Sequence, residues 1–495
     1  MNMNIGANIL IRRASIFAAS LAVVLAVAPF TRAQETPPAP GPPRSANIPK
    51  PVERTLKNGL RVIVIEFANM PLVSAQLVIK SGGEIDPAAL SGAADMTASL
   101  LDKGTGTRSA PEIARAIEAL GGTLNSGAAW DYSQVAVNVL SPKFGAAMEI
   151  LADVIRNPAF KEDEIERLRQ QYVDAYGVSL TQPSSIANYA AARLIFGDSP
   201  YGHPLSGTSE SLARIKRADI VQLHSKFYRP DNAILVIGGD IKADAAFKIA
   251  ESRFGDWAKP QAPIEVSAAS AAANSKPRVV VIDMPDSGQA AVFAVHAGIK
   301  RTDPDYFRGI VANTVLGGGY SARLNQEIRI KRGLSYGANS SLVLHRNGGW
   351  FVASTQTKNE SGPEVASLII GEMARLSSEP TPESELTPRK AVLIGSFGRR
   401  LETADGIVEQ CAALALHGIP LDQINGYVNS VSSVTPSDVR QFASAHIDPK
   451  NTSIVVVGDS KLFIEDLRKR FQSVEVIPIG SLDVNSASLR KPPAG

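Results

Sequence analysis

The sequence is poor in the groups that mark several common classes of protein. A single cysteine, Cys411, among 495 residues excludes an intramolecular disulfide framework and a metal site built from cysteines alone. The net charge of +3 comes from Arg12, Arg13 and Arg32, which lie in residues 1–33, a segment without acidic residues. The rest of the chain is balanced, with 48 basic and 48 acidic residues. With no basic run, the composition argues against a nucleic-acid-binding protein.

Paired histidines are also absent. No two of the six histidines lie within five residues of each other, so the sequence contains neither H-E-x-x-H nor H-x-x-E-H. Both motifs need two imidazoles one helical turn apart to bind one metal ion. We therefore interpret all six as isolated surface or core residues: His203, His224, His296, His345, His417 and His446. The glycine run Gly317–Gly319 is not followed by Gly-Lys-Ser/Thr, which excludes a phosphate-binding P-loop.

The N-terminal residues 1–33 are typical of an export signal. Arg12 and Arg13 precede the apolar run Ile16–Ala28, and Ala33 ends the segment where a signal peptidase needs small residues. The apolar run has 13 residues, whereas about 20 are needed to span a bilayer. We predict cleavage after Ala33, no membrane span in the mature chain and a periplasmic protein, exported by the general or the twin-arginine route.

Low-complexity segments divide the rest of the chain. Residues 34–50 are rich in proline and are expected to form an extended tether. Residues 258–277 are rich in alanine and serine and are expected to be a linker. The predicted domains are therefore an N-terminal half, 51–257, and a C-terminal half, 278–483, followed by a tail, 484–495.

The two halves contain an internal repeat. Residues 218–241 align with 437–460 without a gap at a spacing of 219, and eight of 24 residues are identical. The identical pairs are Asp219/Asp438, Gln222/Gln441, Ser225/Ser444, Pro230/Pro449, Asn232/Asn451, Val236/Val455, Gly239/Gly458 and Asp240/Asp459. Each copy predicts a helix, a turn with proline and asparagine, and a short apolar strand.

Strand and helix patterns in each half do not alternate strictly as βαβ units. Arg61–Phe67 and Ser133–Leu140 have the composition of strands, whereas Lys143–Ile155 and Glu162–Tyr176 have the pattern of helices. We predict an α+β fold of two homologous halves, each with antiparallel-rich sheets and helices packed on one face.

Two segments, 92–105 and 316–336, are the most distinctive in the chain. With them, residues from Pro51 to about Phe471 resemble the pitrilysin or insulinase-type zinc metallopeptidases, a family that includes the mitochondrial processing peptidases. The resemblance implies a clamshell arrangement of the halves. It also implies that Arg329 and Tyr336, in the second segment, reach the active site of the opposite half or subunit, bind the substrate backbone and help to stabilise the oxyanion.

The first segment departs from the family pattern, in which G-x-A-H-x-x-E-H precedes a helix ending in Lys-Gly-Thr. The frame is kept by Gly92, Ala94 and the sequence Lys103-Gly104-Thr105. In this frame the two histidine ligands fall on Asp95 and Ser99, and the catalytic glutamate falls on Ala98.

The third metal ligand, a glutamate in the family, falls near Asp174 or Ala175. Ala98 cannot accept a proton from a metal-bound water, and the remaining groups are weak substitutes for two imidazoles and a carboxylate. We therefore predict no zinc in this chain and no peptide hydrolysis by this chain alone.

Two functions are consistent with these features. The first is a non-catalytic, substrate-binding subunit of a periplasmic heterodimeric zinc metallopeptidase, which supplies Arg329 and Tyr336 while a homologous partner supplies zinc. The alternative is an inactive peptide-binding or structural assembly protein of the cell envelope. Weak residual metal binding at Asp95 and Asp174 remains a third possibility.

Overall fold

The computed structural model describes residues 47–264 and 276–492. The expected signal peptide, 1–33, lies outside the described residues, as do most of the tether and the centre of the linker. The last residues of the tether are packed: the backbone N–H of Ile48 donates to Asn425 Oδ1 over 2.9 Å, and the Asn425 amide donates back to the Ile48 carbonyl over 2.9 Å.

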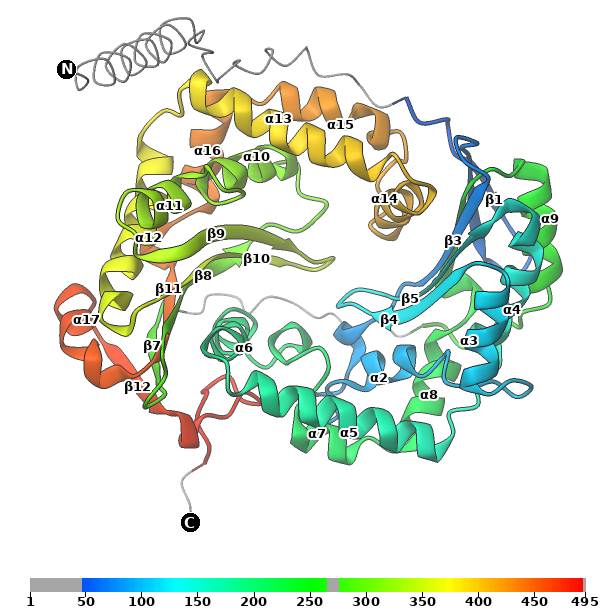
Figure 1. Ribbon diagram of the computed structural model, residues 1–495, viewed down its shortest axis with the longest axis horizontal. Coiled ribbons are helices and arrows are strands. Elements are labelled where there is room, and N and C mark those ends of the chain that lie inside the picture. Colours follow the sequence, from blue (N-terminus) through cyan, green and yellow to red (C-terminus); the bar gives the residue numbers. More distant parts are fainter. Residues whose placement is uncertain (1–46, 265–275, 493–495) are drawn as a thin grey trace, which may run out of the picture. The chain divides into compact units, whose positions relative to one another are not determined.

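In the described part of the chain, each half builds a six-stranded sheet (Figure 1). The first has the order β1-β2-β6-β3-β5-β4, with β1 (Val52–Thr55), β2 (Arg61–Glu66), β3 (Leu72–Ile79), β4 (Thr123–Ala128), β5 (Ser133–Leu140) and β6 (Ala233–Gly239). The second has the order β12-β7-β11-β8-β10-β9, with β7 (Val279–Asp283), β8 (Ala290–Gly298), β9 (Ser335–Leu344), β10 (Gly349–Thr357), β11 (Ser453–Gly458) and β12 (Val474–Pro478).

Most neighbouring strands pair antiparallel. The parallel pairs are β2 with β6, β7 with β11, and β7 with β12. The predicted α+β class with antiparallel-rich sheets is confirmed.

The internal repeat corresponds to a repeat of structure. Helices α8 (Arg217–Phe227) and α16 (Pro436–His446) begin and end at the same positions in the two copies. Near the start of each, an aspartate accepts a hydrogen bond from the backbone N–H that precedes the helix: Asp219 from Lys216 over 2.8 Å and Asp438 from Thr435 over 2.9 Å. The shared aspartate is thus explained by helix capping.

The other helices of the first half are α2 (Ala93–Ser99), α3 (Ala110–Ala119), α4 (Phe144–Arg156), α5 (Glu162–Ser179), α6 (Pro183–Phe196), α7 (Ser209–Arg214) and α9 (Ala243–Phe254). Those of the second are α10 (Tyr306–Leu316), α11 (Arg323–Asn325), α12 (Gly362–Ser378), α13 (Glu383–Arg400), α14 (Ala404–Leu416), α15 (Gln423–Ser432) and α17 (Ile464–Arg470). None of these described helices is both long enough and apolar enough to cross a membrane.

The two halves exchange one helix each. Helix α14 of the second half packs on β3 and β6 of the first sheet, and α6 of the first half packs on β8 and β11 of the second sheet (Figure 1). In β2, Val62 and Val64 therefore face the helices of their own half, whereas Ile63 and Ile65 face α14. Burial on both faces accounts for the continuous apolar runs of the central strands.

The described part of the expected tail is packed. Val484 and Leu489 are 3% and 0% exposed and belong to the apolar cluster around α6. The guanidinium of Arg193, on α6, donates to the Val484 carbonyl over 2.6 Å. These residues therefore belong to the hydrophobic core of the protein.

Candidate functional site

Helix α2 carries the positions that correspond to a metal-binding motif, and it is firmly held at its N-terminus. Gly92 precedes the helix with φ of 96°, a conformation that favours glycine. The carboxylate of Asp86 accepts the N–H groups of Gly92 over 2.8 Å and Ala94 over 2.9 Å. Burial raises the pKa of Asp86 well above its usual range.

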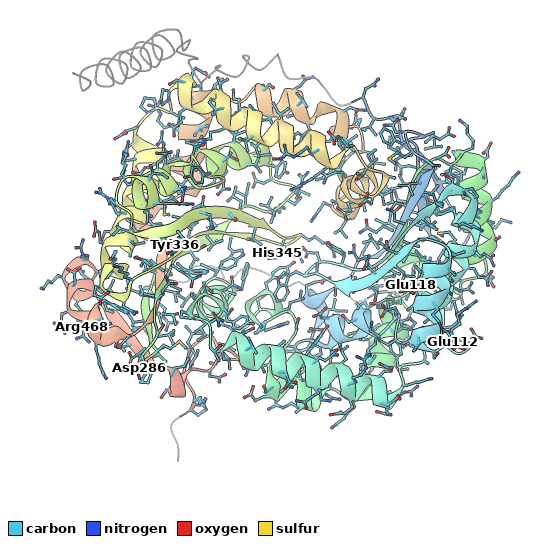
Figure 2. All side chains as sticks on the ribbon, in the orientation of Figure 1. Glu112, Glu118, Asp286, Tyr336, His345 and Arg468 are labelled. Carbon is cyan, nitrogen blue, oxygen red and sulfur yellow. The ribbon has the colours of Figure 1, made fainter. Side chains whose placement is uncertain are left out.

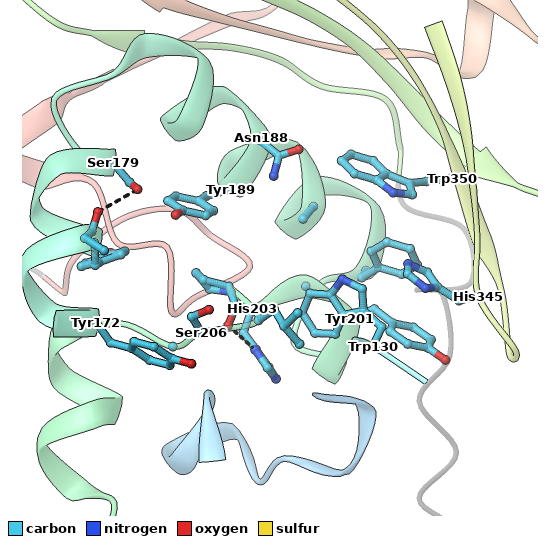
Figure 3. Close-up of a pocket in the computed structure, with 18 residues that line it drawn as sticks. Trp130, Tyr172, Ser179, Asn188, Tyr189, Tyr201, His203, Ser206, His345 and Trp350 are labelled. Carbon is cyan, nitrogen blue, oxygen red and sulfur yellow. Dashed lines mark hydrogen bonds between the residues drawn. The ribbon is translucent and has the colours of Figure 1, made fainter. Parts of the chain in front are cut away.

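The polar groups of α2 are engaged in hydrogen bonds inside the protein. The hydroxyl of Ser206 donates to Asp95 Oδ2 over 2.5 Å, and the hydroxyl of Tyr172 donates to Ser99 Oγ over 2.9 Å. Figure 3 labels Ser206 and Tyr172. Ala98 is fully buried. Burial raises the pKa of Asp95, although the Ser206 hydroxyl opposes the shift. The structure therefore places Asp95 and Ser99 on one helix, and each of the two side chains already accepts a hydrogen bond from the protein.

Asp174 does not join this cluster. It is exposed on α5, and its carboxylate accepts the Gln170 side-chain amide over 2.9 Å. The α5 side chain that reaches α2 is Tyr172. Sequence reasoning did not identify Tyr172 or Ser206, and no motif marks either one.

The residues around α2 do not fit a zinc ion. Zinc prefers imidazole, thiolate and carboxylate ligands. Here the carboxylate of Asp95 is accompanied by hydroxyl groups, and the carboxylate of Asp86 already accepts two backbone N–H groups. Among the described residues, no group of three or more His, Cys, Asp or Glu side chains could hold a metal ion. This donor set also lacks a base at Ala98 that could activate a water molecule.

Arg329 and Tyr336 lie in the second distinctive segment. Arg329 is in a π-helical turn, Gln326–Ile330, and Tyr336 is on the edge strand β9. The Arg329 guanidinium lies over the ring of Tyr320, 4.9 Å from its centre, and Tyr336 is 88% exposed (Figure 2). The nearby carboxylate of Glu327 pairs with Lys331 and Arg332. A cationic and a phenolic donor are thus presented on the surface of this segment.

Three other residues of this segment, Gly318, Ser321 and Arg323, have structural roles. Arg323 forms an ion pair with Glu385 over 2.8 Å, and Ser321 accepts hydrogen bonds from Arg389, so α13 holds the segment from behind. A Cβ atom added at Gly318 would lie 2.7 Å from Thr314 Cα. Close packing therefore explains this glycine, whereas the exposed Tyr336 has no equivalent structural explanation.

Comparisons with known proteins agree with this arrangement. Residues 61–209 match the family model described as Insulinase (Peptidase family M16), and residues 214–393 match the model described as Peptidase M16 inactive domain. An uncharacterized zinc protease of Mycobacterium tuberculosis (strain ATCC 25618 / H37Rv) is 26% identical over 423 residues, which cover 85% of this chain and 95% of that protein. The non-peptidase homolog YmxG of Helicobacter pylori (strain ATCC 700392 / 26695) is 24% identical over 411 residues, covering 82% of this chain and 93% of that protein.

Solved structures share the fold. The crystal structure of a peptidase M16 inactive domain from Pseudomonas fluorescens matches with a TM-score of 0.76 and 26% identity, over 82% of this chain and 98% of that one. A protease from Helicobacter pylori matches with a TM-score of 0.79 and 20% identity, over 83% of this chain and 100% of that one. With both halves matched, the chain belongs to the M16 (insulinase) peptidase family, with an N-terminal M16 domain and a C-terminal M16 inactive domain.

Proposed function

We propose that this protein is the non-catalytic, substrate-binding subunit of a periplasmic heterodimeric zinc metallopeptidase. One contrast supports the proposal: Asp95 and Ser99 of α2 are hydrogen-bonded within the protein, while Tyr336 is exposed and the half-buried Arg329 lies over the ring of the exposed Tyr320. A homologous partner subunit would supply the zinc and the base. The export signal expected in residues 1–33 supports the periplasmic location.

Arg329 and Tyr336 would act on the substrate in the active site of the partner subunit. A guanidinium and a phenol both donate hydrogen bonds to carbonyl oxygens, and a cation stabilises the negative charge that develops on the scissile carbonyl. Tyr320 would hold the Arg329 guanidinium in place by a cation–π contact. This chain would therefore contribute binding and charge stabilisation, without taking part in proton transfer.

Co-expression with a homologue from the same organism that carries an intact H-x-x-E-H motif tests this function. The rate to measure is kcat/KM of the purified complex on a fluorogenic peptide. Arg329→Ala and Tyr336→Phe should each lower it about tenfold or more, a loss of at least ~1.4 kcal/mol of transition-state stabilisation. Arg468→Ala, at an exposed arginine on α17, and Tyr320→Phe, which keeps the ring under Arg329, are the matched controls. Unchanged rates for both active-site variants would eliminate the proposed role.

The second candidate is an inactive peptide-binding or structural assembly protein of the cell envelope. The H. pylori relative whose name is non-peptidase homolog favours this candidate. Affinity purification of the tagged chain from its own organism separates the two functions. A stoichiometric zinc-bearing homologue supports the peptidase subunit, whereas a homodimer or an unrelated envelope complex supports the second candidate.

A further inference from the structure

A small pocket of about 230 Å³ is lined by residues of both halves. Lys80 and Ser81, which follow β3, line it together with Arg346, from the turn between β9 and β10. Phe227 and Leu416, the last residues of α8 and α14, line it as well. No residue of α2 or of the segment 316–336 is among the described residues that line this pocket, so it is separate from the site described above.

Among the described residues, the charge of Lys80 has no direct partner. Its side chain is half-buried, and its ammonium group neither donates a hydrogen bond nor forms an ion pair there. Burial lowers the pKa of Lys80, and the charge of Arg346 acts in the same direction. Asp231 opposes the shift, but its carboxylate is paired with Arg229 over 2.6 Å. An anion beside Lys80 would therefore compensate an unmatched charge.

Arg346 brings a second cation to the same pocket. Its guanidinium donates to the Lys80 carbonyl over 3.1 Å and to the Asp131 carbonyl over 2.6 Å. Both acceptors are neutral backbone groups, so they fix the position of the guanidinium without cancelling its charge. The carboxylate of Asp131 accepts the backbone N–H of Arg346 over 3.0 Å and does not line the pocket.

Glu84 is the only acid among the described residues that line the pocket. One carboxyl oxygen accepts the Gly82 backbone N–H over 2.7 Å, and the other lies 3.7 Å from the Arg346 guanidinium. Burial raises the pKa of Glu84 to about 7, although Arg346 opposes the shift. At about pH 6 this carboxyl group is therefore largely uncharged, and the positive charge of Lys80 and Arg346 prevails in the pocket.

The rest of the lining combines one hydroxyl donor with an apolar wall. Ser81 Oγ accepts the Asn232 side-chain amide over 3.1 Å, which leaves the Ser81 hydroxyl proton available to a ligand. The remaining lining residues are apolar: Ile85, Phe227, Ile264 and Leu416. The volume is below the range of about 300–1,000 Å³ that is typical of pockets for drug-sized ligands. A fitting ligand is therefore small and has an anionic end and an apolar body.

We propose that this pocket binds a small organic carboxylate with an apolar body. The carboxylate would accept hydrogen bonds from Lys80, Arg346 and Ser81, and the body would contact Phe227 and Leu416. A free short-chain carboxylic acid and the C-terminal residue of a peptide both have this chemistry. The proposal goes beyond the subunit role and does not depend on it.

Calorimetric titration of the full mature chain with 4-methylpentanoate at about pH 6 tests the proposal. The acid should bind with a Kd of about 1 mM or below. Two other compounds should each bind at least tenfold more weakly: 4-methylpentanamide, which has the same shape without the charge, and inorganic phosphate, which has a charge without the apolar body. Lys80→Met should also weaken binding of the acid at least tenfold, because it removes the ammonium group and keeps a long side chain.

Lys248→Met, at an exposed lysine of α9 that does not line the pocket, is the matched control and should bind the acid as the wild type does. Four results would each overturn the proposal: no binding of the acid up to about 10 mM, equal affinities for the acid and the amide, phosphate binding as tight as that of the acid, or an unchanged affinity in Lys80→Met. The first three are measured on the wild type, so they do not depend on the folding of any variant.

A tripeptide distinguishes the two sources of the carboxylate. N-acetyl-Ala-Ala-Leu is titrated with a free C-terminus and as its C-terminal amide. Binding of the free tripeptide at least as tight as that of 4-methylpentanoate, and lost in the amide, would support the proposal with the C-terminus of a peptide as the ligand. Weaker binding of the tripeptide than of 4-methylpentanoate would support it with a free short-chain acid as the ligand.

Discussion

At the scale of single residues, Asp95 and Ser99 on α2 have side-chain oxygen atoms, but these atoms do not form a metal site. Asp95 and Ser99 retain lone pairs, yet Ser206 and Tyr172 donate hydrogen bonds to them. Burial also raises the pKa of Asp95, which disfavours the ionised carboxylate that a metal would need. The loss of metal-binding character therefore involves the neighbours of α2 as well as α2 itself.

Restoring the motif on α2 is expected to be insufficient for stable zinc binding. The triple variant Asp95→His, Ala98→Glu and Ser99→His should hold well below one zinc per chain after dialysis against a weak chelator, because α5 presents Tyr172 there in place of a carboxylate. Adding Tyr172→Glu should raise the content toward one zinc per chain. Metal analysis of the purified variants decides the matter, and full zinc retention by the triple variant would contradict the prediction.

At the scale of elements, the glycine run before α11 holds its segment against α10. A methyl group at Gly318 would lie 2.7 Å from Thr314 Cα, whereas one at Gly319 would meet nothing within 4 Å. Gly318→Ala should lower the free energy of unfolding by about 1–3 kcal/mol, because overpacking forces the backbone to move. Gly319→Ala should stay within about 1 kcal/mol of the wild type. Urea unfolding measures both, and equal stabilities would argue against a packing role for Gly318.

Local signals in the sequence were sufficient for some elements and insufficient for others. The internal repeat at a spacing of 219 correctly predicted a helix in each copy, α8 and α16, because capping aspartates and turn residues act over a few positions. The exchange of α6 and α14 was not predicted, since an apolar helix face does not specify which sheet it covers. The α5 residue that contacts α2 was expected near Asp174. Which α5 side chains face α2 is decided, however, by the packing of the two helices. Asp174 is exposed, and Tyr172, two residues earlier, makes the contact.

At the scale of the whole described molecule, a buried polar cluster joins the two halves of the chain. Glu84 is 3% exposed and lies 3.7 Å from the Arg346 guanidinium, and Arg346 also binds Asp131. Residues more than 200 positions apart in the sequence form this cluster, which is why no sequence pattern indicated it. Any change in its ionisation affects the stability of both halves, because each half covers a sheet of the other.

Glu84 should make the folded protein less stable as the pH rises. Burial raises the pKa of Glu84 to about 7, although Arg346 opposes the shift. A carboxyl group with a raised folded-state pKa stabilises the protein fully below its unfolded-state pKa of about 4.5, and this contribution is lost as the pH rises to about 7. A shift of this size corresponds to about 3 kcal/mol.

The measurement is urea unfolding at pH 5 and pH 8. The free energy of unfolding of the wild type should decrease between the two pH values, and Glu84→Gln should remove up to about 3 kcal/mol of that decrease. Glu118→Gln, at an exposed residue of α3, should show the same decrease as the wild type (Figure 2). Burial raises the pKa of Asp86 as well, and the charge of Glu84 adds to that shift, so the difference reports Glu84 together with its effect on Asp86. The same pH dependence in Glu84→Gln and in the wild type would show that Glu84 is ionised in the folded protein and that Arg346 outweighs burial.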